Sequence, residues 1–197
     1  MLESNNQNFN HLKIHTQYSI CEGAIKIDNL KDFCKENKIP CLGLSDTSNL
    51  CGALEFAENI SKVGTQPIIG TQIYFRFEDT TGLLPLIALN EKGYKRIIEL
   101  SSRSYLENDP LSNPHLDIKE LFSDTEGVLL LSGTIQGLFG KLFMKGRLEE
   151  ITKIYKSLLS KFHDNFYLEI QRHGDQNETT FEKFNLEQSS KIKIPII

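Results

Sequence analysis

Two histidines flank a lysine in the stretch NHLKIHTQYS at residues 10–19. Alternate side chains of a β-strand share a face, so His11, Lys13 and His15 are expected to point the same way. Two imidazoles on one face are typical of a metal site, because neutral imidazole is a common metal ligand. The ammonium group of Lys13 argues against such a site, since a protonated lysine has no lone pair to offer. The residues alone leave both interpretations open.

Other polar residues stand near the ends of short apolar runs. Asp46 closes CLGLSD at 41–46, and His173 follows NFYLEIQR at 165–172. A βα barrel places its active site at the carboxyl ends of its strands. Position alone therefore predicts one candidate site, which contains His11, Lys13, His15, Asp46, His173 and Gln72. Two structural alternatives stay open: His11 as a hydrogen-bonded structural histidine, and Asp46 as a helix-capping residue.

Apolar runs alternate with helical patterns along the chain. Strands are predicted at 11–16, 41–46, 66–79, 82–90, 127–133, 165–172 and 194–197. Helices are predicted at 27–40, with Asp28 as its cap, at 47–64, capped by Thr47 or Ser48, at 91–106, at 134–163 with a break near Gly146, and at 177–192. Repeated βα units predict a mainly parallel sheet covered by helices. No GxGxxG or GxxxxGK[ST] motif is present, so nucleotide-binding folds with those loops have no support.

The composition predicts a soluble, cytoplasmic protein. The chain has 197 residues, 39% hydrophobic and 24% charged, with a net charge of −4. That charge gives no general attraction to nucleic acid, and no apolar run is long enough to span a membrane. The four cysteines form no CxxC pair, so reduced, buried thiols are expected. We predict a flexible segment at 1–9, one domain at 10–197, and a chain cut inside its next βα unit after KIKIPII.

Several segments together resemble one protein family. They are HLKIHTQYSICEGAIKI, CLGLSDTSNLCGALEFAENISKVGTQPIIGTQIYF, NEKGYKRIIELSS, GVLLLSG and FYLEIQRHG. In this order they resemble the N-terminal PHP (polymerase and histidinol phosphatase) domains of bacterial DNA polymerase III alpha subunits. The resemblance implies a distorted seven-stranded βα barrel, incomplete at its C-terminus. Metal-bearing members hold two or three metal ions at the barrel mouth and hydrolyse phosphoesters, because the metals activate water and neutralise phosphate charge.

The ligand positions of the family can be carried over one by one. His15, Asp46 and His173 match ligands of the family and remain as remnant metal-site positions. The other mapped positions depart from the family pattern: Lys13, Thr47, Gln72, Leu83 and Thr134. A multi-metal site needs several anionic or neutral donors, so we expect no catalytic residue here and at most one weak metal site. We hypothesise that the Lys13 ammonium lies near Asp46 and replaces the metal.

The resemblance also implies a role in DNA replication. The whole protein would be a DNA-directed DNA polymerase whose missing polymerase domain uses magnesium, while this region needs no cofactor. The expected partner of this domain is the proofreading exonuclease (epsilon) subunit. The missing regions would contact the sliding clamp, the clamp-loader tau subunit and primer-template DNA, and no membrane contact is expected. Two alternatives are an active metal-dependent phosphoesterase or 3′–5′ exonuclease, and an independent sugar-phosphate phosphatase of the histidinol phosphatase type.

Overall fold

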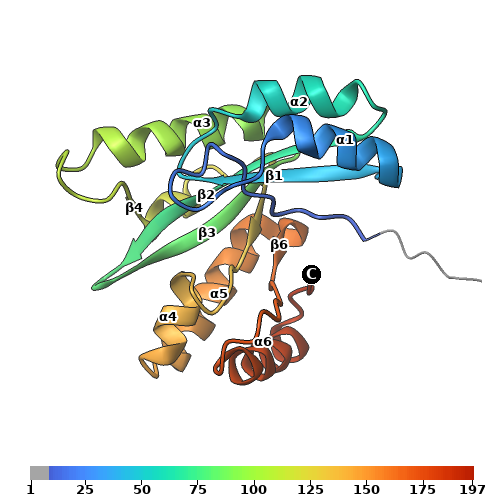
Figure 1. The fold of residues 1–197 in the computed structure, drawn as a ribbon. Coiled ribbons are helices and arrows are strands. Elements are labelled where there is room, and N and C mark those ends of the chain that lie inside the picture. The colour runs from blue at the N-terminus through green and yellow to red at the C-terminus, as the bar shows by residue number, and fades with distance from the viewer. Residues whose placement is uncertain (1–8) are drawn as a thin grey trace, which may run out of the picture.

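The computed structural model describes residues 9–197. Apart from residue 9, the segment predicted to be flexible at 1–9 lies outside the described residues. The described chain is a mixed α/β fold built on one six-stranded sheet. In Figure 1, helices α1, α2 and α3 lie along one side of the sheet, and α4, α5 and α6 gather on the other side.

The sheet has a parallel part at each side and an antiparallel centre. Its strands are β1 (Cys41–Thr47), β2 (Gln66–Phe77), β3 (Thr80–Ala88), β4 (Leu116–Asp117), β5 (Val128–Leu131) and β6 (Phe166–Tyr167). Their order is β1-β2-β3-β5-β6, and β4 pairs with β2. The central strand β3 runs antiparallel to both β2 and β5, while the other five strands point the same way, so the prediction of a mainly parallel sheet is confirmed with β3 as the exception. The reversal of β3 is local: Phe77 pairs with Thr80, so a two-residue turn joins the two strands, which agrees with the two residues left between the predicted strands 66–79 and 82–90.

Extended segments continue the sheet at both of its edges. The predicted strand 11–16 is represented by isolated bridges, one of which joins Ile14 to Leu44 of β1. At the other edge, Leu168 bridges to Ile196, so the predicted strand at 194–197 follows the extension of β6. The regular strand β6 is much shorter than the predicted strand 165–172. The closed seven-stranded barrel therefore stays a prediction.

The helices follow the predicted pattern, and α1 and α3 begin at the predicted residues 27 and 91. They are α1 (Ile27–Asn37), α2 (Ala53–Ser61), α3 (Glu91–Leu106), α4 (Leu138–Met144), α5 (Leu148–Phe162) and α6 (Glu178–Ile192), with short 3-10 turns at Ile118–Phe122 and His163–Asn165. Lys26, not Asp28, is the N-cap residue of α1. Helix α2 begins after Gly52 rather than at Thr47 or Ser48, because Thr47 still pairs with Gln72 in the sheet.

Apolar side chains form two cores that fix the sheet against its helices. The larger core joins β2, β3 and β5 to α3–α6 and includes Ile73, Leu86 and Tyr155. The smaller core packs one face of β1 against α1 and α2. Buried thiols are confirmed only for Cys34; Cys21 and Cys51 are exposed, because both lie in turns outside these cores. Within residues 9–197, no helix is long and apolar enough to cross a membrane.

Candidate functional site

One cavity lies where most of the mapped positions meet. It has a volume of about 260 Å³, and we call it the mouth cavity. Its walls contain six of the eight mapped positions, namely Lys13, His15, Gln72, Leu83, Thr134 and His173. The remaining lining residues are Pro85, Gly133, Gln136, Gly137 and Gln171. Segments from residue 13 to residue 173 thus bring the departed and the remnant positions to one place.

The Lys13 ammonium has a different partner from the one expected. Its Nζ donates to Oε1 of Glu169 at 2.9 Å, and the two side chains are only 15% and 6% exposed. The hypothesis that Lys13 lies near Asp46 is therefore wrong about the partner, although the amine does line the cavity. The extended backbone explains its direction: Ile14 packs on the smaller core, so the neighbouring Lys13 faces the opposite side.

The buried Asp46 carboxylate binds the loop at residues 16–19, which follows the extended segment 11–16. Its Oδ1 accepts from the Thr16 amide at 2.6 Å and from the Ser19 hydroxyl at 2.7 Å. Its Oδ2 accepts from the Thr16 hydroxyl at 2.7 Å. The capping alternative is also wrong, because α2 starts seven positions later, at Ala53. Three hydrogen bonds from neutral donors therefore tie Asp46 to the loop at residues 16–19. Asp46 does not line the mouth cavity.

His15 stands between this loop and Gln72. Its ring nitrogens lie 3.5 Å from the Ser19 hydroxyl and 3.5 Å from the Gln72 amide, which are long contacts. Burial, together with the nearby Lys13 ammonium, lowers the pKa of His15 below its ordinary value of 6.5. The imidazole is therefore neutral at pH 7 and available for hydrogen bonding.

Gln72 and Thr47 are tied to each other. The Gln72 amide donates to the Thr47 hydroxyl at 3.0 Å, and that hydroxyl donates to Glu22 at 2.5 Å. The resemblance described above implies a carboxylate at position 72 and an imidazole at position 47, whereas the residues present are an amide and a hydroxyl. Both groups are engaged in hydrogen bonds that end on the Glu22 carboxylate.

The other predicted positions are spread over the rim. His173 is exposed and lies on the cavity lining, and its backbone amide donates to Glu178. Leu83 contributes an apolar side chain to the cavity wall, and Thr134 contributes a hydroxyl group. His11 does not line the mouth cavity, and its ring packs against Phe9 with centroids 4.9 Å apart.

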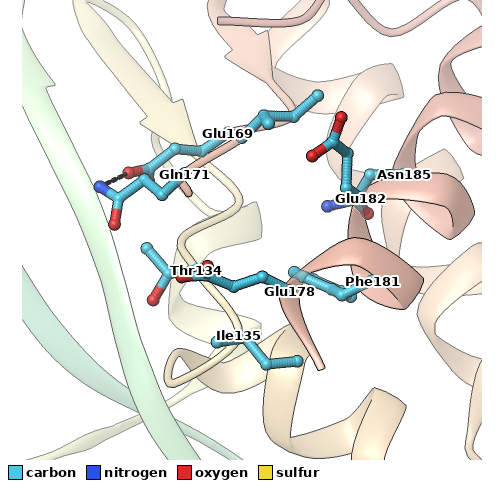
Figure 2. A pocket seen from close by; sticks show the side chains of 9 residues that line it. Thr134, Ile135, Glu169, Gln171, Glu178, Phe181, Glu182 and Asn185 are labelled. Carbon is cyan, nitrogen blue, oxygen red and sulfur yellow. Dashed lines mark hydrogen bonds between the residues drawn. The ribbon is translucent and has the colours of Figure 1, made fainter. Parts of the chain in front are cut away.

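Glu169 is the functional candidate that sequence reasoning missed. It continues β6 at the carboxyl end, and its backbone amide donates to the Ser132 hydroxyl at the end of β5. A carboxylate buried in the apolar run FYLEI needs a cation or several donors, and that signal was present in the sequence. Its Oε1 also accepts from Gln171 at 2.6 Å, a contact drawn in Figure 2.

A second, very small cavity lies behind Glu169. Its volume is about 10 Å³, room for about one water molecule. Figure 2 shows Thr134 and Gln171 on one side of it and Glu182 and Asn185 of α6 on the other. Glu182 is already paired with Arg172, and Glu178 already accepts from three backbone amides. Two other residues of its lining, Glu169 and Asn185, each keep one buried polar atom without a hydrogen-bond partner among the described residues, namely Oε2 and Nδ2.

The side chains present do not fit a metal cluster. Within residues 9–197, no group of three or more His, Cys, Asp or Glu is arranged to hold a metal ion. A structural zinc site uses four such donors and calcium takes six or more oxygen ligands. Here one candidate carboxylate is committed to a loop and the other to an ammonium group.

The fold and the site define a mixed α/β domain with a polar cavity at the ends of its strands. The sequence model of the PHP domain family matches residues 11–173. The chain belongs to the PHP domain family. It is 37% identical over 183 residues to a DNA polymerase III subunit alpha of Caulobacter vibrioides, covering 88% of this chain and 16% of that protein. It is 31% identical over 192 residues to the same subunit of Vibrio cholerae, covering 96% of this chain and 17% of that protein.

A solved structure supports the fold. A putative metal-dependent phosphoesterase from Bifidobacterium adolescentis aligns with a TM-score of 0.58 and 12% identity, over 95% of this chain and 85% of that one. At this identity the likeness concerns the fold alone. The chain is thus homologous to the N-terminal region of the polymerase subunits and spans about a sixth of their length.

Proposed function

We propose that this chain is the PHP domain of a DNA polymerase III alpha subunit and that its metal site has been replaced by a tethered cation. The observation that carries the proposal is the ion pair between Lys13 and Glu169 beside the mouth cavity. The Lys13 ammonium lies on the mouth cavity, among the positions that correspond to metal ligands in other PHP domains. Even in a partly screened environment, two like charges about 4 Å apart repel by about 4 kcal/mol, so Lys13 disfavours a divalent ion there.

The remaining donors support loss of hydrolysis. Phosphoester hydrolysis by metal ions needs a metal-bound water and a second positive charge on the phosphate. In this chain, Gln72 and Thr47 hydrogen-bond to each other, and Asp46 holds a loop. The domain would therefore act as a scaffold without catalytic residues of its own.

The same ion pair supports a closed barrel. Lys13 belongs to the segment beside β1 at one edge of the sheet, and Glu169 follows β6 at the other edge. A contact between the two edges requires the sheet to curl. We infer that the complete domain forms the distorted seven-stranded barrel of its family, with the segments 11–16 and 194–197 as its outer strands.

The scaffold would serve a replicative polymerase in the bacterial cytoplasm. The full-length protein would add nucleotides with magnesium bound in a separate polymerase region, which would also contact DNA, the sliding clamp and the clamp-loader tau subunit. This domain would stabilise that polymerase and dock the proofreading epsilon subunit. The 31% and 37% identities to alpha subunits support this assignment.

Two measurements test the proposal. Elemental mass spectrometry of the purified protein should find less than one bound zinc, manganese or iron ion per chain, and a phosphoesterase assay should give no rate that a chelator abolishes. Mixing with the epsilon subunit of the same organism should give a complex in size-exclusion chromatography. Stoichiometric metal with chelator-sensitive phosphate release would establish the metal-dependent phosphoesterase instead.

A further inference from the structure

Glu169 is built as a cation-binding group. Its side chain is only 6% exposed. Its backbone amide donates to the Ser132 hydroxyl at the end of β5, which holds the residue in place. Oxygen Oε1 accepts two hydrogen bonds, from Lys13 and Gln171. Within the described chain, Oε2 is buried without a hydrogen-bond partner. The carboxylate is therefore held rigidly and retains the capacity to accept further hydrogen bonds from a cation.

The cation that Glu169 binds comes from far away in the chain. Lys13 precedes it by 156 residues and reaches it through a flexible four-carbon stem. A buried carboxylate without a cation is strongly disfavoured, so Glu169 needs a cation beside it. The cation present is a primary ammonium, which carries three N–H donors and directs one of them at Oε1.

We propose that Glu169 determines which cation the mouth cavity accepts, and that the site selects a primary alkylammonium group supplied by Lys13. This inference rests on the proposed function, because it explains how the tethered cation excludes free ions. Gln171 directs its amide nitrogen at Glu169, so its donor side faces the carboxylate. A divalent ion there would find one carboxylate where it needs four or more ligands, whereas a single carboxylate is enough to neutralise one ammonium. The selectivity for ammonium over divalent metal follows from this arrangement.

The test replaces the tethered cation with a free one. Lys13→Ala removes four side-chain heavy atoms, and n-propylammonium contains the same three carbons and one nitrogen. Isothermal titration calorimetry should show that the Lys13→Ala chain binds n-propylammonium at least about tenfold more tightly than n-propanol, its neutral isostere. Wild-type protein and Lys13→Met should not bind it, because their own side chains fill the position. The double variant Lys13→Ala with Glu169→Gln should lose the binding.

A local readout accompanies the calorimetry. Hydrogen exchange of the peptide 166–173 should speed up in Lys13→Ala and slow again on addition of n-propylammonium. Manganese alone should not slow it. Equal binding of n-propylammonium and n-propanol, or binding that survives Glu169→Gln, overturns the proposal.

A measurement on the native lysine covers the case in which the alanine variant does not fold. The Lys13 ammonium protons of the wild-type protein should give a resolved ¹H–¹⁵N signal, since the ion pair protects them from water. Glu169→Gln should abolish that signal. A signal that persists in Glu169→Gln overturns the role of Glu169, whereas stoichiometric metal in the wild-type protein would overturn the proposed function. The two failures are therefore distinguishable.

Discussion

Replacing Lys13 with methionine removes the charge of the ion pair and keeps most of the side-chain volume. The Glu169 carboxylate then stays buried with Gln171 as its one side-chain donor. Leaving one partner of a fully buried pair uncompensated costs about 3–5 kcal/mol. Because Lys13 is 15% exposed, water reaches part of the pair, and we expect about 2–4 kcal/mol of lost unfolding free energy.

The double variant of Lys13→Met with Glu169→Gln provides the decisive control. A neutral glutamine no longer needs a cation, so the double variant should recover most of the loss, with a coupling energy of about 2 kcal/mol. Urea unfolding, followed by circular dichroism at pH 7, measures all four proteins of the cycle. Glu169→Gln alone should also destabilise, because it leaves the ammonium uncompensated. A coupling energy near zero would refute the reasoning, since the two residues would then contribute independently.

Four further predictions concern the surroundings of this pair. Lys13→His places a second imidazole beside His15, yet elemental mass spectrometry should still find no stoichiometric metal, because the other departed positions remain. The lowered pKa of His15 means that the unfolded state binds its proton more readily, so stability should fall as the pH drops below 6.5; in His15→Asn this loss should shrink, as thermal unfolding at pH 7.5 and 5.5 would show. Asp46→Asn should cost about 2 kcal/mol and speed up hydrogen exchange at residues 16–19, because an amide nitrogen then meets hydrogen-bond donors. Tyr155→Phe should cost about 1–3 kcal/mol in urea unfolding, since it leaves the buried oxygen of Asn185 without its donor.

Local signals in the sequence predicted the helices well. Helix α3 occupies the predicted residues 91–106 because Asn90 caps it by accepting from the Gly93 amide, and its apolar residues recur on one face. The predicted break near Gly146 also holds, since Gly146 has φ +75° between α4 and α5. In both cases the determining interactions lie within a few residues.

Interactions between distant residues were predicted less well. Strand β6 pairs with β5, more than 30 residues earlier in the chain, and its regular part is much shorter than the predicted strand 165–172. Six of the eight mapped positions line one cavity, because the family pattern carries three-dimensional information, whereas Asp46 and Thr47 lie outside its lining. The partner of Lys13 was missed because no local rule connects a segment beside β1 with a carboxylate beyond β6. A charged residue inside an apolar strand run marks a buried carboxylate, but it does not reveal which cation pairs with it.

The polar groups around the mouth cavity form three separate pairings, and this has consequences for any attempt to create a metal site there. Lys13 neutralises Glu169, Gln72 donates to Thr47, and Asp46 accepts from the loop that follows the first segment. A metal ion would have to displace an ammonium, break an amide–hydroxyl contact and release a loop before gaining its ligands. Each of these steps removes hydrogen bonds that are buried or partly buried, so their costs accumulate. Single substitutions should therefore leave the site without metal, and only variants that restore imidazole and carboxylate donors at positions 13, 47 and 72 together should bind one.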